Sequence, residues 1–214
     1  MENSKLNLIL ASTSPRRKEL LGHLGIPFEI MSLNVSEDSN TPDPKNFCRE
    51  LAIKKGSAVS QKLQVTNPDT NYLVVAADTI VSLGQKIYNK PADRQEARKF
   101  LSELSNKTHS VFTAVSIQLI YRGHPELFNF VDESRVTFDQ ISPELMESYL
   151  DTGDSLDKAG AYGIQGPSLT FISRVEGSYS NVVGFPLSRF VVEAESFLKQ
   201  KFPKEDSWFN LFQR

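Results

Sequence analysis

Residues 6–17 read LNLILASTSPRR, and this stretch decides the fold. The apolar run from Leu6 to Ala11 is typical of a buried strand. Ser14 is then a good helix N-cap with Pro15 at the first helical position, and leucines at helical spacing continue the pattern. A buried strand that leads directly into a helix is the repeating unit of an α/β sheet.

The rest of the chain continues to alternate strand and helix patterns. Strands are expected over 28–33, 73–77, 110–121, 127–138, 169–175 and 181–183, a hairpin over 80–88, and helices over 44–63, 93–104, 142–150 and from 186 onward. The two long strands are separated by a short connection, which favours an antiparallel pair inside the sheet. We therefore expect the α/β class, with a mixed, twisted central sheet flanked by helices.

Length and charge narrow the possibilities further. With 214 residues, one domain over 1–202 and an aromatic tail over 203–214 is the simplest organisation. The formal net charge of -2 excludes a general positive surface for nucleic acid or anionic membrane. The single cysteine, Cys48, excludes an internal disulfide, and no apolar run approaches a membrane span. We expect a cytoplasmic protein that binds neither nucleic acid nor membrane.

The segment between the first strand and helix is a candidate phosphate site. Free backbone N–H groups at a helix start attract anions, and Ser12, Ser14, Arg16 and Arg17 surround this one. The alternative is an ordinary capped helix with solvent-facing arginines, which the motif alone does not exclude.

Carboxylates and lysines form further candidates. Strand 73–77 is expected to carry Asp78 at its carboxyl end, where open α/β sheets bind ligands. Together with Glu37, Asp78 would offer oxygen ligands for Mg²⁺ and a base for water, although each alone is more often a cap or a surface acid. Lys55 and Lys90 would add positive charge, but Lys62 shares the arc of Lys55, so simple snorkelling is the alternative.

A fourth candidate is the glycine-rich loop 154–166, which is followed by the motif at 177–181. Its glycines at 160, 163 and 166 let the backbone approach a flat ligand, and Gln165 is expected to be a buried amide that recognises it. The three histidines lie outside all these motifs, so neither a serine triad nor a histidine metal site is expected.

These motifs, taken together, resemble the Maf family of nucleoside triphosphate pyrophosphatases, whose fold is similar to that of the inosine triphosphate pyrophosphatases. The resemblance covers about 6–200 and rests on five ordered motifs: ASTSPRR at 11–17, ADT at 77–79, KP at 90–91, DKAGAYGIQG at 157–166 and GSYSNVVG at 177–184. Five motifs in order along one chain are specific, whereas each alone is weak.

The resemblance implies roles for individual residues. Asp78 would be the catalytic proton acceptor, and the phosphate and metal site would be lined by Ser12, Arg16, Arg17, Glu37, Lys55 and Lys90. A divalent cation, Mg²⁺ or Mn²⁺, and a homodimer are also implied. The GIQG sequence at 163–166 resembles the subfamily that acts on dTTP and UTP rather than on 7-methyl-GTP, with Arg16, Thr79 and Gln165 as specificity positions.

The resulting hypothesis is metal-assisted attack of water on the α-phosphorus, which yields a nucleoside monophosphate and pyrophosphate. Gln165 can pair with the N3–H and O4 of uracil or thymine, but a flipped amide would also accept cytosine. Two alternatives stay open: a broader pyrophosphatase that clears modified nucleotides, and a nucleotide-binding regulator of cell division and septum formation with little turnover.

Overall fold

The computed structural model describes residues 5–212 as a mixed α/β fold, so the fold class predicted from the sequence is confirmed. The strands are β1 (Asn7–Leu10), β2 (Phe28–Ile30), β3 (Tyr72–Leu83), β4 (Lys86–Tyr88), β5 (Thr108–Tyr121), β6 (His124–Phe138) and β7 (Ile172–Glu176). The α-helices are α1 (Pro15–Gly22), α2 (Pro44–Thr66), α3 (Arg94–Leu104), α4 (Pro143–Asp151), α5 (Tyr179–Val183) and α6 (Leu187–Lys201). Short 3₁₀ helices are η1 (Ala159–Ala161), η2 (Pro167–Thr170) and η3 (Trp208–Leu211). Among the described residues, no helix is long and apolar enough to cross a membrane.

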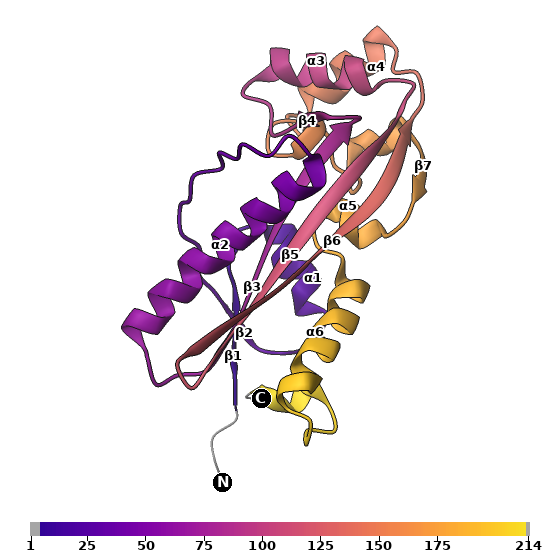
Figure 1. Ribbon diagram of the computed structural model, residues 1–214. Helices are drawn as coiled ribbons and strands as arrows, with labels where there is room; N and C mark the ends of the chain where they lie inside the picture. Colours follow the sequence, from indigo (N-terminus) through magenta and orange to yellow (C-terminus); the bar gives the residue numbers. More distant parts are fainter. Residues whose placement is uncertain (1–4, 213–214) are drawn as a thin grey trace.

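The strands form one sheet in the order β2-β1-β3-β5-β6-β7, with β4 paired to β3 outside this path. β1 is parallel to β2 and β3, whereas β3, β5, β6 and β7 follow one another antiparallel. Figure 1 shows the long helix α2 on one face of the sheet and helices α1 and α6 on the other. The sheet is therefore covered on both faces.

Alternation along the strands explains this layering. Ile9 and Val74 pack with Val59 of α2, whereas Leu8 and Val75 pack with Phe190 of α6. Successive side chains of a strand point to opposite faces, so β1 and β3 need apolar residues at nearly every position. That requirement accounts for the unbroken apolar runs in both segments.

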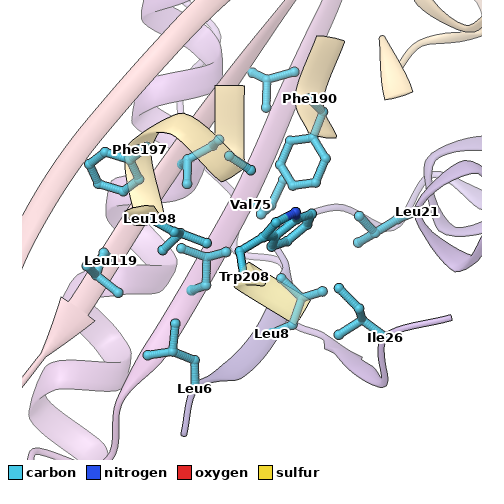
Figure 2. Close-up of a cluster of buried hydrophobic side chains, with 14 of the residues drawn as sticks. Leu6, Leu8, Leu21, Ile26, Val75, Leu119, Phe190, Phe197, Leu198 and Trp208 are labelled. Carbon is cyan, nitrogen blue, oxygen red and sulfur yellow. The ribbon is translucent and has the colours of Figure 1, made fainter. Parts of the chain in front are cut away.

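The C-terminal segment completes the core on the α6 face. Trp208 is packed among Leu8, Phe190 and Leu198, as Figure 2 shows, and it is 5% exposed. Phe212 forms an isolated parallel bridge with Leu6 at the start of the chain. The sequence predicted a domain over 1–202 and a tail over 203–214. Residues 1–4 of that domain and 213–214 of that tail lie outside the described part of the chain.

Three expectations about strands were wrong. The strand expected over 169–175 begins only at Ile172, because Pro167–Thr170 form η2. The strand expected over 73–77 continues to Leu83, because β5 pairs with β3 along its whole length and the ladder runs on past Asp78 and Thr79. The strand expected over 181–183 belongs to helix α5 instead. Ser178 caps that helix by accepting a hydrogen bond from the N–H of Asn181 at 3.3 Å, and this local bond outweighs the strand preference of the valines.

Candidate active site

A cavity of about 930 Å³ lies beyond the carboxyl end of β1. Its size is at the upper end of the range for small-molecule sites. All ten residues that the sequence singles out line it: Ser12, Ser14, Arg16, Arg17, Glu37, Lys55, Asp78, Thr79, Lys90 and Gln165. Residues far apart in the sequence therefore meet at one place in the fold.

The position of this cavity follows from the unequal lengths of β1 and β3. The parallel ladder between them ends at Leu10 and Val75, whereas β3 continues for several residues. Asp78 and Thr79 thus lie on a stretch of β3 that has lost its β1 neighbour, and their side chains point to opposite faces of the sheet. Both faces of β3 contribute to one site.

On the α2 face, Lys55 joins two carboxylates into a carboxylate cluster (Glu37, Lys55 and Asp78). The Lys55 Nζ lies 2.6 Å from Asp78 Oδ1 and 2.7 Å from Glu37 Oε1. Lys62, which was expected on the same face of this helix, is exposed instead. Since Lys55 is engaged with two acids in the cavity, the snorkelling alternative for Lys55 is not what the structure shows.

Helix α2 holds Lys55 at this place because its start and its apolar face are both defined. Asp43 caps the helix by accepting a hydrogen bond from the Asn46 N–H at 2.8 Å, and Pro44 occupies the first helical position. Cys48 is fully buried in the helix, as expected for a packing residue, and its Sγ donates to the Asp78 carbonyl at 3.2 Å. The helix is thereby tied directly to the strand that carries the acid.

The electrostatics of the cluster differ between its members. Burial raises the pKa of Asp78, against the opposing effects of Lys55 and Arg17. The hydrogen bond from Lys55 lowers the pKa of Glu37, which is more exposed. Burial alone would lower the pKa of Lys55, but the two carboxylates outweigh it and raise that pKa. Lys55 is therefore protonated at neutral pH, and Asp78 is a stronger base than an exposed aspartate.

The donor chemistry of this cluster suits a hard divalent cation. Glu37 and Asp78 supply carboxylate oxygens that converge on one point, the Lys55 ammonium. In residues 5–212, no group of three or more His, Cys, Asp or Glu side chains could hold a metal ion. Mg²⁺ commonly binds through one or two carboxylates, with phosphates and water completing its shell, so two carboxylates fit a cation that arrives with a nucleotide.

On the opposite face of β3, Arg17 organises a hydroxyl network (Ser12, Arg17, Thr79 and Thr113). The Arg17 Nε donates to the Gly184 carbonyl at 3.0 Å, and its Nη1 and Nη2 donate to Ser12 Oγ at 3.3 Å and Thr79 Oγ1 at 3.0 Å. Burial lowers the pKa of Arg17, yet a guanidinium stays protonated in proteins. The planar fork thus fixes three separate segments around the cavity.

The helix start is arranged somewhat differently from the prediction. Ser14 occupies the N-cap position of α1, but its side chain makes no capping hydrogen bond. Its N–H donates to Ser12 Oγ at 3.2 Å instead. The Ser14 hydroxyl is therefore not consumed by the cap.

The glycine-rich loop 154–166 forms another wall of the cavity and is joined to α1 by an ion pair. Arg16 Nη1 lies 3.2 Å from Asp157 Oδ2, and the Lys158 Nζ binds Asp157 Oδ1 at 2.6 Å and Asp154 Oδ1 at 2.8 Å. No individual role was predicted for these three loop residues, although two of them belong to the DKAGAYGIQG motif. Gln165 lines the cavity but is exposed, so its expected burial was wrong.

The cavity wall also includes Tyr162, whose partner sequence reasoning missed. Its hydroxyl lies 2.7 Å from His109 Nε2, and both residues are buried. Burial lowers the pKa of His109 to about 3, so the ring is neutral at physiological pH. His109 therefore supports the wall rather than contributing charge. No sequence signal connects two residues more than fifty positions apart.

A family model described as Maf-like protein matches residues 7–197. This chain belongs to the Maf-like family. The resemblance predicted from the five motifs is thereby confirmed. Among curated relatives of this Maf-like chain, the dTTP/UTP pyrophosphatase of Deinococcus radiodurans is 44% identical over 181 residues, which cover 85% of the chain and 88% of that protein.

Two further relatives carry the same description. The dTTP/UTP pyrophosphatase of Alkaliphilus oremlandii is 43% identical over 186 residues, 86% of this Maf-like chain and 93% of the relative. That of Bacillus thuringiensis subsp. konkukian is 40% identical over 191 residues, 89% and 95%. A solved nucleoside-triphosphatase / dITP/XTP pyrophosphatase from Mycobacterium abscessus is 11% identical with a TM-score of 0.37, covering 94% of this chain and all of that one.

Proposed function

We propose that this Maf-like protein hydrolyses dTTP and UTP to the nucleoside monophosphate and pyrophosphate. The observation that carries the proposal is the carboxylate cluster: a buried Asp78 with a raised pKa, placed beside Lys55 in the wall of a nucleotide-sized cavity. The relatives named dTTP/UTP pyrophosphatase support both the reaction and the substrates.

In this proposal, positive groups around the cavity bind the triphosphate. Phosphoryl transfer depends mainly on positioning and on neutralising charge, and this wall supplies both without a covalent intermediate. The phosphate-binding residues are Ser12, Ser14, Arg16, Arg17, Lys55 and Lys90. Lys90 is exposed at the rim, which suits contact with an incoming polyanion.

Asp78 is the proposed base. It takes a proton from water as the water oxygen attacks the α-phosphorus, the bond from that phosphorus to the bridging oxygen breaks, and pyrophosphate leaves with the bond's electron pair. A base is most effective when its pKa is close to the working pH, so the burial that raises the pKa of Asp78 favours this role. Glu37 and Asp78 would hold Mg²⁺ or Mn²⁺, which would withdraw charge from the phosphate oxygens.

At the nucleoside end, the proposed specificity positions are Arg16, Thr79 and Gln165, all of which line the cavity. Gln165 is exposed on the glycine-rich loop, so it can adapt its amide to a base that enters the cavity. The homodimer and the cytoplasmic location stay predictions.

The experiment is a substrate panel with dTTP, UTP, CTP and 7-methyl-GTP, read out as pyrophosphate release in Mg²⁺ and in Mn²⁺. The wild type should favour dTTP and UTP, and Asp78→Asn should lower turnover by at least about 100-fold because it removes the base. Asp132→Asn is the matched control, because Asp132 is also an ion-paired acid but pairs with Arg189 outside the cavity.

Two results would contradict the proposal. Turnover that survives in Asp78→Asn would remove Asp78 from the chemistry, and a flat substrate profile would contradict the dTTP and UTP assignment. Tight nucleotide binding by the wild type without any pyrophosphate release would favour the regulator that the sequence left open.

A further inference from the structure

Thr113 in β5 controls the direction of a buried chain of hydrogen bonds. It lies opposite Thr79 in the β3–β5 ladder and is fully buried. The Thr113 hydroxyl donates to the carbonyl of Asn181 at 2.9 Å, and a carbonyl oxygen can only accept. Since a hydroxyl has one hydrogen, the 3.0 Å contact between Thr113 and Thr79 must have Thr79 as its donor.

Thr79 can therefore offer a ligand only one kind of hydrogen-bonding group. Its hydrogen points to Thr113, and one of its lone pairs accepts from Arg17 Nη2 at 3.0 Å. The Gly184 carbonyl also lies within reach, but at 3.5 Å, and already accepting from Arg17 Nε at 3.0 Å, it competes only weakly for this hydrogen. Thr79 lines the cavity, so the capacity it has left for a ligand is that of an acceptor.

This restricts the ligand groups that Thr79 can bind. A phosphate oxygen is itself an acceptor, so no hydrogen would lie between it and the Thr79 oxygen. An N–H group of a base can donate to the Thr79 oxygen and form a hydrogen bond. The N3 position of uracil and thymine carries a hydrogen, but the N3 of cytosine is a lone pair. Cytosine carries its N–H donors on N4 instead, so a locked acceptor that meets the N3 position distinguishes the two kinds of pyrimidine, which the exposed Gln165 amide cannot do because it can flip.

We propose that Thr113 is a positioning residue that locks the Thr79 hydroxyl as an acceptor and thereby makes the site prefer uracil and thymine nucleotides to cytosine nucleotides. The inference rests on the proposed function for its ligand class. It adds a residue outside the cavity lining to the residues that determine specificity.

The direction of the Thr113 hydroxyl is fixed because its acceptor, the carbonyl of Asn181, is also held in place. Asn181 is fully buried, and its Nδ2 donates to the Val111 carbonyl at 3.0 Å and to Ser134 Oγ at 2.9 Å. The Asn181 carbonyl is therefore held in place for Thr113. Reversing the direction of either hydroxyl would cost free energy, because it would leave a buried polar group without a hydrogen-bond partner.

The test compares Thr113→Val with Thr108→Val as the matched control. Thr108 belongs to the same strand and forms a similar hydroxyl pair, 2.8 Å from Thr137, but it does not line the cavity. Binding of the non-hydrolysable α,β-imido analogues of UTP and CTP is measured by calorimetry, and pyrophosphate release from UTP and CTP is measured alongside.

In the wild type, the UTP analogue should bind more tightly than the CTP analogue. Thr113→Val should lower that preference about tenfold, chiefly by tightening CTP binding, because the freed Thr79 hydroxyl can donate to cytosine N3. Thr108→Val and the hydroxyl-retaining Thr113→Ser should keep the wild-type preference.

An unchanged preference in a folded Thr113→Val protein would overturn the inference, and so would a wild type that binds both analogues equally. If Thr113→Val does not fold, Thr79→Val decides: weaker binding of the UTP analogue alone supports the inference, and equal losses for both analogues contradict it. If the wild type releases pyrophosphate but Thr113→Val keeps the wild-type preference for the UTP analogue, only the inference is contradicted. If the wild type releases no pyrophosphate but Thr113→Val lowers that preference, only the proposed function is contradicted.

Discussion

Asp78 and Thr79 are adjacent in β3, yet their side chains belong to two networks of different chemistry. Asp78 faces α2 and joins the carboxylate cluster, whose contacts to Lys55 are ion pairs of 2.6 and 2.7 Å. Thr79 faces the other side and joins the hydroxyl network, in which Arg17 donates to three uncharged oxygens. The alternation of a single strand separates the two networks.

This comparison assigns different tasks to the two sides of the cavity. Groups in the carboxylate cluster titrate and have shifted pKa values, so they can move a proton and respond to pH. Hydroxyls and carbonyls keep their protonation state across physiological pH, so the other network can recognise a ligand without responding to pH. Chemistry is therefore expected on the α2 side and recognition on the α1 side.

The largest effect is expected from Lys55→Met. It removes a proposed phosphate-binding cation and should lower kcat/KM at least about 100-fold. With Asp78 as the proposed base, activity should require its ionised form and should fall as the pH drops through its pKa. Lys55 lowers that pKa, so its loss should move the acid limb of the profile to higher pH. The measurement is kcat/KM for UTP between about pH 5 and pH 9.

Lys62→Met provides the control for this change, because Lys62 belongs to the same helix but is exposed and does not line the cavity. It should leave both the rate and the profile unchanged. An acid limb that stays in place in Lys55→Met would separate Asp78 from the titration and would remove the distinction between the two sides.

An intermediate effect is expected from Arg17→Lys. Lysine keeps the charge but cannot reproduce the fork that reaches Gly184, Ser12 and Thr79 at once, so kcat/KM should fall about 10- to 100-fold. Arg16→Lys should lower kcat/KM only a few-fold, because Arg16 forms a partly exposed ion pair with Asp157. A larger loss in Arg16→Lys than in Arg17→Lys would contradict the organising role of Arg17.

The smallest effect is expected from Glu50→Ala, which loosens the loop that carries Glu37. Glu50 of α2 accepts hydrogen bonds from Ser39 at 2.5 Å and from Thr41. Without these anchors, Glu37 should be held less firmly beside Lys55, and the Mg²⁺ concentration for half-maximal activity should rise several-fold at unchanged kcat. Glu195→Ala, at an exposed position of α6, is the control. If Glu50→Ala instead lowers kcat several-fold at saturating Mg²⁺, a role of Glu50 confined to positioning Glu37 would be contradicted.

Local signals account for most of the fold that the sequence predicted. Helix α2 begins at Pro44, as expected, because the Asp43 cap and the proline act within one turn. The antiparallel pair β5–β6 follows from two long apolar segments and a short connection. The hairpin expected over 80–88 is confirmed by the β3–β4 pairing. The continuity of β3 from Tyr72 to Leu83 could not be predicted in this way, because it depends on pairing with β5 along the whole strand.

The candidate site shows the same division. Eight of its ten residues belong to the five motifs, and Glu37 and Lys55 were proposed from their places after the second strand and on the helix expected over 44–63, but the partners that orient these residues were not predicted. Thr113 supports Thr79 across the sheet, and Asp157 pairs with Arg16 from a loop that lies far along the chain. Such contacts depend on register and on loop packing, for which the spacing of residues carries no signal.

The sequence by itself determined the residue types and their order: a helix start rich in hydroxyls and arginines, an acid in a buried strand, and a glycine-rich loop. These features rest on local physics, because caps, periodicity and turn residues act over a few positions. Only the tertiary structure decided that β3 outruns β1, so that Asp78 and Thr79 face one cavity from opposite sides of the sheet. The physical reason is that burial, pKa shifts and hydroxyl directions are properties of neighbours in space, and the fold chooses those neighbours.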